Sequence, residues 1–434
     1  MLGMVLDIRV EFQTRQGVLG AAIDIPQQGA AGLELAGVKF DGSRLDFEIA
    51  AAGAVFEGEL HPDETISGEM RQSGMSGTFS LERADPKPVV SATPEPVPYQ
   101  EVEVTFASGD VKFAGTLTLP PGGVPHPAVI LITGSGPQDR DETIFGFKLF
   151  RVIANHLTRH GIAVLRYDDR GVGGSTGDVN QATTEDFAGD VLSALDLLQN
   201  RPDVDSAQIG LLGHSEGGIV APLAATRSDG VAFLVLMAGT ALPGDVILVE
   251  QLKLILRAGG ATDAHIEQQV QLQEQIIAKI RTGEGWDLVE SRLRQISLEE
   301  LDGMSAAERA AIADADEFAD AVVRQRLQAA QTPWFRYFVD YDPRLALGQV
   351  QVPVLAVFGE LDLQVPAVPN QKALVRTLEQ ANHREYTTVI VPGANHLFQK
   401  AVTGNPTEYA RLEPEFLPGF LDLITNWILE DVLS

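Results

Sequence analysis

The feature that most constrains this chain is a serine between a short apolar run and a helix-like run. Residues 209–212 are apolar and predict a buried strand, and residues 218–225 have the pattern of a helix. Gly213 and Gly217 flank Ser215 in the order G-x-S-x-G. A sharp strand-to-helix turn holds its serine in a strained backbone, and it needs glycines where a Cβ would clash. The pattern predicts that Ser215 is a nucleophile; the alternative is a tight turn with a capping serine.

Two later residues can supply the partners of a serine nucleophile, which are a base and a group that orients the base. His396 and Asp362 each follow a predicted strand. Open parallel sheets build their sites at the carboxyl ends of strands, so we expect both residues near Ser215. Glu360 is the rival acid on the same turn, but Asp362 lies two residues further from the strand end. We therefore predict Ser215, Asp362 and His396 as catalytic residues; a loop histidine and a turn aspartate are the structural alternatives.

An oxyanion hole needs two backbone N–H donors, one after the serine and one in the loop after the third strand. Glu216 follows Ser215 and supplies the first donor. The glycine-rich loop 133–139 follows an apolar run that we expect to be the third strand. We predict the second donor in this loop, at Ser135 or Gly136.

The periodicity of the chain divides it into four parts. Residues 1–83 alternate apolar and polar side chains in short runs, which predicts an antiparallel β-domain. Five prolines within residues 84–98 predict a semi-rigid linker. Strand and helix patterns alternate over 99–240 and again over 347–434, which predicts an α/β domain with a mostly parallel sheet and helices on both faces. Residues 241–346 are helical in pattern and are expected to form a cap inserted after the sixth strand.

Individual elements of the α/β domain follow from the same patterns. We expect strands at 101–107, 113–119, 128–133, 162–167, 209–212, 232–237, 352–358 and 386–391, and helices at 145–160, 185–199, 368–380 and 415–433.

An aromatic cluster lies late in the predicted cap. Trp334, Phe335, Tyr337 and Phe338 fall within five residues. Such a cluster usually packs in a core, and lining an acyl pocket is the functional alternative. On the second interpretation Trp334, Phe335 and Phe338 bind the substrate.

The charge balance excludes several classes of partner. The chain has 60 acidic and 32 basic residues and a formal net charge of −28, whereas nucleic acids and anionic membranes require a basic surface.

No apolar run approaches the roughly 20 residues that span a bilayer, so no membrane insertion is expected. The first residues lack the features of a signal peptide, which predicts a cytoplasmic protein, or a periplasmic or secreted one if a signal was removed. The absence of cysteine excludes disulfides and thiolate chemistry.

Two further motifs do not predict ligand sites. The glycine-rich segment 171–177 departs from G-x-G-x-x-G and has no P-loop lysine. His156 and His160 are four residues apart, but the glutamate of the zinc motif H-E-x-x-H is absent. We therefore predict no metal site, and we expect Asp169 and Arg170 to brace the loop over the active site.

Together these motifs resemble the α/β-hydrolase superfamily. The similar segments are GHSEGG (213–218), TGSGPQDRDE (133–142), RYDDRGVGGSTGD (166–178), GELD (359–362) and GANH (393–396). They look like those of bacterial EstD-like carboxylesterases with an N-terminal β-domain, near the serine aminopeptidase-type hydrolases. The resemblance covers about residues 99–434, and IPQQGAAG at 25–32 is similar to the β-domain often fused ahead of such esterases. Thr133 stands where many lipases of the superfamily have histidine.

The resemblance implies the α/β-hydrolase fold and a triad of Ser215, Asp362 and His396. It implies hydrolysis of short acyl esters through an acyl-enzyme intermediate, with a small-molecule ester as partner and no cofactor. A serine peptidase or thioesterase of the same fold remains an alternative, as does a catalytically silent scaffold that binds a ligand. The sequence leaves the oligomeric state open.

Overall fold

The computed structural model describes residues 8–15, 18–25, 30–49, 54–72, 75–83, 97–303, 309, 312 and 314–433. The chain forms two compact units: residues 97–281 with 331–434, which we call the sheet unit, and residues 1–96 with 282–330. Of the predicted linker 84–98, only residues 97 and 98 lie within the described part of the chain. The predicted domain boundaries therefore stay a prediction, and residues 26–29 of the segment 25–32 also lie outside the described residues.

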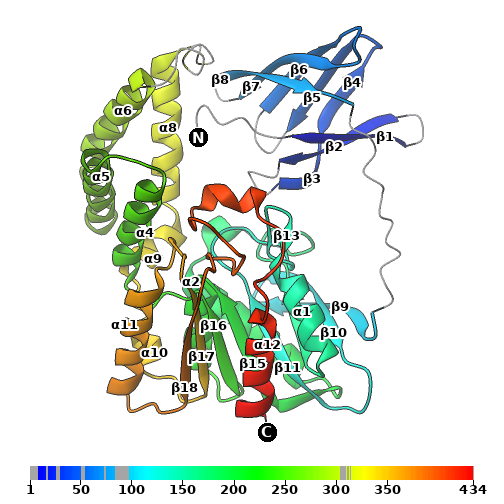
Figure 1. Ribbon diagram of the computed structural model, residues 1–434, viewed down its shortest axis with the longest axis vertical. Coiled ribbons are helices and arrows are strands. Elements are labelled where there is room, and N and C mark those ends of the chain that lie inside the picture. Colours follow the sequence, from blue (N-terminus) through cyan, green and yellow to red (C-terminus); the bar gives the residue numbers. More distant parts are fainter. Residues whose placement is uncertain are drawn as a thin grey trace. The chain divides into compact units, whose positions relative to one another are not determined.

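An eight-stranded, mostly parallel sheet forms the centre of the sheet unit (Figure 1). Its strands are β9 (Gln100–Ser108), β10 (Val111–Leu119), β11 (His126–Ile132), β14 (Ala163–Tyr167), β15 (Val204–His214), β16 (Phe233–Met237), β17 (Val354–Gly359) and β18 (Tyr386–Val391). They are arranged in the order β18-β17-β16-β15-β11-β14-β10-β9. Strands β9 and β10 are antiparallel to their neighbours, and the other six are parallel. The fold predicted for this part of the chain is confirmed.

Helices cover both faces of this sheet, because its buried strands are apolar on both sides. They are α1 (Leu149–Arg159), α2 (Thr184–Gln199), α3 (Gly217–Ala225), α11 (Ala367–Gln380) and α12 (Phe420–Asn426), which continues as a π-helical turn (Trp427–Val432). Two short 3-10 helices, η3 (Val179–Gln181) and η4 (Pro406–Arg411), lie in loops.

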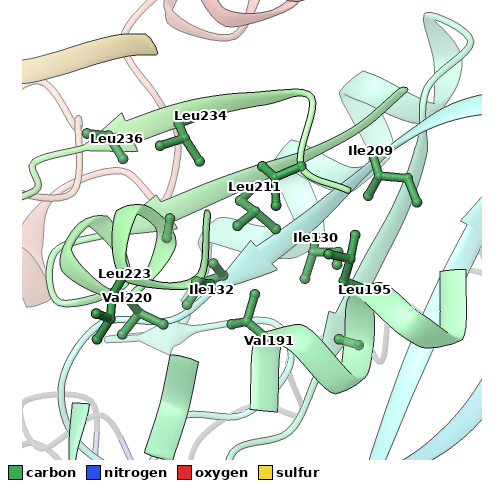
Figure 2. Packing of buried hydrophobic residues seen from close by; sticks show 14 of the residues in the cluster. Ile130, Ile132, Val191, Leu195, Ile209, Leu211, Val220, Leu223, Leu234 and Leu236 are labelled. Carbon is green, nitrogen blue, oxygen red and sulfur yellow. The ribbon is translucent and has the colours of Figure 1, made fainter. Parts of the chain in front are cut away.

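Alternate residues of each strand serve the two faces. Ile130 and Ile132 of β11 belong to one core cluster with Val191 and Leu195 of α2 (Figure 2). Their neighbours in β11 belong to a second cluster with side chains of α1 and α12. Each fully buried side chain of this kind contributes about 1.5–3 kcal/mol, so the two clusters hold the strand ends, and hence the site, in a fixed frame.

Two helices begin at least four residues after the predicted start. The helix expected at 145–160 begins only at Leu149, because β12 (Thr143–Ile144) and β13 (Phe147–Lys148) form a short hairpin before it. The last helix, expected from 415, begins at Phe420. Gly419, directly before it, has a φ of +80°. This left-handed conformation changes the direction of the backbone, so the helix cannot extend toward 415.

Strand order creates a switch point at the carboxyl end of the sheet. Strand β14 pairs with one edge of β11, and β15, the next strand in the sheet along the chain, pairs with the other edge. The chain therefore leaves β11 and β15 in opposite directions, which opens a crevice between their ends. The loop at 133–139 follows β11, and Ser215 follows β15.

All named elements between 244 and 347 are helices, as predicted. In the sheet unit these are α4 (Gly244–Ala258), α5 (Asp263–Thr282, which reaches its boundary), α9 (Pro333–Asp340) and α10 (Arg344–Leu347). In the second unit α6 (Trp286–Gly303) and α8 (Ala315–Ala330) pack against each other.

The described residues before 84 form two antiparallel sheets, as the alternation predicts. One contains β1 (Arg9–Arg15), β2 (Val18–Ile25) and β3 (Ala30–Glu34); the other contains β4 (Ala36–Phe40), β5 (Arg44–Ile49), β6 (Ala54–Leu60), β7 (Ile66–Gln72) and β8 (Met75–Leu81). Phe47 and Phe56 stack at 4.6 Å between ring centroids in their core. Across the described parts of the chain, no helix combines the length and the apolar character needed to cross a membrane.

Candidate active site

Ser215 occupies a strained turn between β15 and α3. Its φ is +53°, in the left-handed region that side chains rarely adopt. A Cβ on Gly213 would lie 2.0 Å from the Gly217 carbonyl oxygen, and one on Gly217 would lie 2.1 Å from the Ile132 carbonyl oxygen. Neither flanking position could hold a larger residue without moving the backbone. The G-x-S-x-G spacing thus reflects close backbone packing around a half-buried serine.

His396 and Asp362 form a buried pair. His396 Nδ1 lies 2.8 Å from Asp362 Oδ2, and the two residues are 4% and 3% exposed. The other carboxylate oxygen, Oδ1, accepts hydrogen bonds from the backbone N–H groups of Gln364 and Val365, both at 2.8 Å. Because the carboxylate only accepts, His396 carries its proton on Nδ1 and leaves Nε2 free to accept another.

Pairing between two strands brings these residues together. Gly359, the last residue of β17, is paired with Val391, the last residue of β18. The loops that follow stay joined, because the Leu361 N–H donates to the Ala394 carbonyl oxygen at 2.8 Å. Among the described residues, no hydrogen bond joins Ser215 Oγ to His396, as is common in unliganded enzymes, whose catalytic hydrogen bonds tighten when substrate binds.

The rival acid Glu360 lies elsewhere. Its side chain is exposed, and Oε2 accepts a hydrogen bond from the Gly393 N–H at 2.8 Å. It therefore holds the turn before His396, whereas Asp362 meets the imidazole directly.

The loop after β11 lies directly beside the nucleophile. A Cβ on Gly134 would lie 3.2 Å from Ser215 Cβ, so a larger residue would push the loop or the serine a few tenths of an ångström away. The Gly134 N–H donates to Glu142 Oε1 at 2.8 Å. The N–H groups of Ser135, Gly136 and Glu216 donate to no acceptor in the described part of the chain. These three remain available to a developing oxyanion, and Gly134 does not.

Asp169 braces this loop, as predicted. Its two oxygens accept hydrogen bonds from Thr133 Oγ1 at 2.8 Å and from the Gln138 N–H at 2.9 Å. Burial raises the pKa of Asp169 to about 8, although these two hydrogen bonds act in the opposite direction. Arg170 does not reach the loop in this way: it forms a two-bond ion pair with Asp190 of α2, with both distances 2.7 Å.

The Glu216 side chain links the turn to α2 and α9. Oε1 accepts hydrogen bonds from Thr184 Oγ1 and Trp334 Nε1, both at 2.7 Å, and Oε2 has no partner in the described chain. Burial raises the pKa of Glu216 to about 7, and the two hydrogen bonds only partly offset it. A cavity of about 20 Å³, room for about one water molecule, borders Glu216, Gly134 and Asp169.

The aromatic cluster of α9 packs next to the nucleophile turn. The Trp334 and Phe338 rings stack at 5.1 Å, and Phe335 lies 5.8 Å from Trp334. Phe338 shares a small core with Ile219 of α3 and Ile247 of α4. The aromatic residues therefore have a packing role, and their contact with an acyl group stays a prediction.

Sequence reasoning overlooked two buried residues, His214 and Glu142. His214 Nδ1 lies 2.8 Å from Glu142 Oε1, and His214 Nε2 lies 3.1 Å from the His396 carbonyl oxygen. Burial alone lowers the pKa of His214, but the charge and hydrogen bond of Glu142 outweigh it, so the pKa is raised above 6.5. His214 is the last residue of β15, and an imidazole at the end of an otherwise apolar run was the available signal for it; nothing local indicated Glu142.

The described residues contain no group of three or more His, Asp or Glu side chains arranged to hold a metal ion. The chemistry that the site offers is that of a strained serine, a histidine–aspartate pair and free backbone N–H groups.

The chain is similar in sequence to several known proteins. A family model described as the alpha/beta hydrolase family matches residues 80–412. The chain is 31% identical to Esterase EstD of Thermotoga maritima over 364 residues, which are 83% of this chain and 75% of that protein. It is also 31% identical to Esterase FrsA of Vibrio vulnificus, over 27% of this chain and 26% of that protein.

Among solved structures, an esterase of Pyrococcus furiosus matches with a TM-score of 0.47 and 14% identity, covering 79% of this chain and 95% of that one. By the extent of the family match and the similarity to EstD, the chain belongs to the alpha/beta hydrolase family.

Proposed function

We propose that this chain is a serine carboxylesterase that hydrolyses short-chain acyl esters through Ser215, His396 and Asp362. The observation that carries the proposal is the 2.8 Å bond between His396 Nδ1 and Asp362 Oδ2, close to a serine with a φ of +53°. Family membership and the similarity to a protein named as an esterase support the same reaction class.

In the first half of the proposed reaction, Ser215 Oγ attacks the acyl carbon while its proton passes to His396 Nε2. Asp362 holds the tautomer that leaves Nε2 unprotonated and stabilises the imidazolium that forms. When the tetrahedral intermediate collapses, the ester C–O bond breaks and the departing alcohol takes the proton from His396. The acyl group then remains on Ser215 as an ester.

In the second half a water molecule attacks this ester and gives its proton to His396. The Ser215 Oγ–acyl bond breaks, Ser215 recovers the proton from His396, and the carboxylic acid leaves. No cofactor enters either half.

The negative charge of both intermediates falls on the former carbonyl oxygen. The N–H of Glu216 and that of Ser135 or Gly136 are the donors we assign to it, since they have no acceptor in the described chain. Preorganised donors of this kind lower the barrier by about 2.7–4 kcal/mol each.

Short acyl chains are the proposed substrates. The aromatic side chains Trp334, Phe335 and Phe338 of α9 adjoin the elements that carry Glu216 and are the proposed wall of the acyl pocket. An extra buried methylene is worth only about 0.8 kcal/mol, and a clash with a packed wall outweighs it. We expect the highest kcat/KM for acyl chains of roughly two to six carbons on this reasoning.

A serine peptidase or thioesterase would use the same residues, and a silent scaffold would use none of them. A fluorophosphonate probe tests the nucleophile, and matched p-nitrophenyl esters, thioesters and anilides test the reaction class. We expect labelling of the wild type and none of Ser215→Ala. Ser206→Ala is the matched control, because Ser206 is an exposed serine of β15, the strand that leads to Ser215, and this variant should label normally. Anilide turnover above ester turnover would overturn the proposal, as would an unlabelled wild type.

A further inference from the structure

His214 and Glu142 form a buried contact that the proposed reaction does not use. His214 is 1% exposed and Glu142 0%, and they lie 72 residues apart in the sequence. Burying two ionisable side chains is unfavourable unless they are paired and hydrogen-bonded. Their partners therefore identify their role.

The hydrogen bonds of His214 determine where its protons lie. Nε2 faces the His396 carbonyl oxygen at 3.1 Å, and a carbonyl only accepts, so Nε2 carries a hydrogen. Nδ1 faces Glu142 Oε1 at 2.8 Å, so one further proton lies in that bond. The same oxygen accepts the Gly134 N–H at 2.8 Å, and a donor to an oxygen favours its charged form. The second proton therefore belongs on His214.

The charges around His214 agree with placing the second proton on its ring. Glu142 and Asp362 are the acidic groups that face it, and His396 is the nearest other imidazole, with ring centroids 4.8 Å apart. The Glu142 carboxylate compensates for the burial of the ring, which on its own lowers the pKa of His214.

The pair touches the three segments that build the proposed site. His214 immediately precedes Ser215 in the turn, and it holds the backbone of His396. Glu142 accepts the N–H of Gly134, and a Cβ on Gly134 would lie 3.2 Å from Ser215 Cβ. Moving either side chain would shift the base or the oxyanion loop relative to the nucleophile, and misplacement by about 1 Å can cost a hundredfold in rate.

We propose that His214 and Glu142 form a buried imidazolium–carboxylate pair that positions both the His396 backbone and the oxyanion loop around Ser215. They are positioning residues, since neither side chain reaches the reacting atoms. The catalytic consequence rests on the proposed esterase function, whereas the protonation of His214 does not.

The first test reads the protonation of His214 directly. The full chain is labelled with ¹⁵N-histidine, and the signals absent from His214→Asn identify His214 in the wild-type spectrum. We expect both ring nitrogens of His214 to be protonated at pH 7.5, and only one in Glu142→Gln. A singly protonated His214 in the wild type at this pH would overturn the proposal. This measurement needs no turnover, so a failure of the esterase function would leave it standing.

The second test separates positioning from folding. The variant His214→Asn keeps a donor toward Glu142 but its side chain is too short to reach the His396 carbonyl. The variant Glu142→Gln keeps an acceptor for the Gly134 N–H but lacks the charge. We expect kcat for p-nitrophenyl butyrate to fall about ten- to hundredfold in both variants, with KM changed less than about threefold.

Thr118→Val is the matched control for this test. It removes a buried hydrogen bond to Thr158 Oγ1. Thr118 of β10 pairs with Val164 near the amino end of β14, whereas Ser215 follows the carboxyl end of β15, at the other end of the parallel strands. We expect Thr118→Val to lose about as much thermal stability as His214→Asn and Glu142→Gln, and to keep kcat within about twofold of the wild type. An equal loss of kcat in Thr118→Val, or unchanged kcat in His214→Asn and Glu142→Gln, would refute positioning.

Discussion

Replacing Asp362 with asparagine is the sharpest test of the proposed triad, because the structure determines how the amide must sit. Asp362 Oδ1 accepts two backbone N–H groups, from Gln364 and Val365, both at 2.8 Å. Only an oxygen can occupy that position, so the amide NH₂ of the variant must face His396 Nδ1. His396 is then forced to carry its proton on Nε2, where it cannot accept the proton of Ser215.

The expected loss of kcat follows because Asp362→Asn removes the correct tautomer of His396 while the geometry stays intact. Replacement of a triad aspartate by asparagine in another serine hydrolase lowers kcat by about 10⁴-fold, and we expect a loss of the same order here. At 1.36 kcal/mol for each factor of ten, this is about 5.4 kcal/mol of barrier. The fold should persist, since the amide keeps the volume of the side chain and both backbone hydrogen bonds.

The assay is steady-state hydrolysis of p-nitrophenyl butyrate, with the rate of fluorophosphonate labelling as a second measure of serine activation. Glu360→Gln is the control: the amide oxygen can still accept from Gly393, so we expect a loss of less than about threefold. The reasoning fails if Asp362→Asn retains more than a tenth of wild-type kcat. It fails equally if Glu360→Gln is the more damaging change.

Three further predictions concern residues around Ser215. Ser215→Ala should lower kcat by about 10⁶-fold and leave the melting temperature unchanged, and His396→Ala should cost about as much, as measured by ester hydrolysis and calorimetry. Because burial raises the pKa of Glu216 from 4.5 to about 7, the folded state holds this proton more tightly than the unfolded chain. This proton therefore stabilises the fold by up to about 3 kcal/mol at low pH, and the contribution is lost as the pH rises from 4.5 to 7. Glu216→Gln should reduce the difference in melting temperature between pH 5 and pH 8. An unchanged difference would contradict this prediction. Trp334→Phe removes the N–H donor to Glu216 and should destabilise the protein by about 1–3 kcal/mol in denaturant titrations, whereas Trp334→Ala should move the best acyl chain toward greater length; an unmoved optimum would rule out Trp334 as the wall.

Much of the fold could be predicted because periodicity reports local backbone geometry. Strand β18 (Tyr386–Val391) has the boundaries expected, and α2 and α11 each begin one residue before the predicted start. The starts of α1 and α12 were missed where the backbone changes direction within a few residues, at the β12–β13 hairpin and at Gly419. Neither event changes the apolar pattern on which the prediction depends. The strand expected at 209–212 is longer, Val204–His214, and its start was missed because its first residues are mostly polar.

In the candidate site, too, local features could be predicted from the sequence and contacts between distant segments could not. The turn around Ser215 could be recognised from sequence because its glycines, strand and helix are contiguous, and a local steric requirement leaves a local pattern. The sequence also indicated His396 and two acids on one turn, and Asp362 was preferred to Glu360 only because it lies two residues further from the strand end. That choice depends on the path of the loop after β17, where the structure directs Asp362 to the imidazole and Glu360 to Gly393.

Other contacts were decided only by the tertiary structure. Glu142 meets His214 across 72 residues, and Trp334 meets Glu216 across 118. Glu142 also accepts the Gly134 N–H, so this N–H is not available as an oxyanion donor. A hydrogen bond requires donor and acceptor within about 3 Å and in line, and for segments so far apart in the chain only the packing of the sheet and its helices sets that distance.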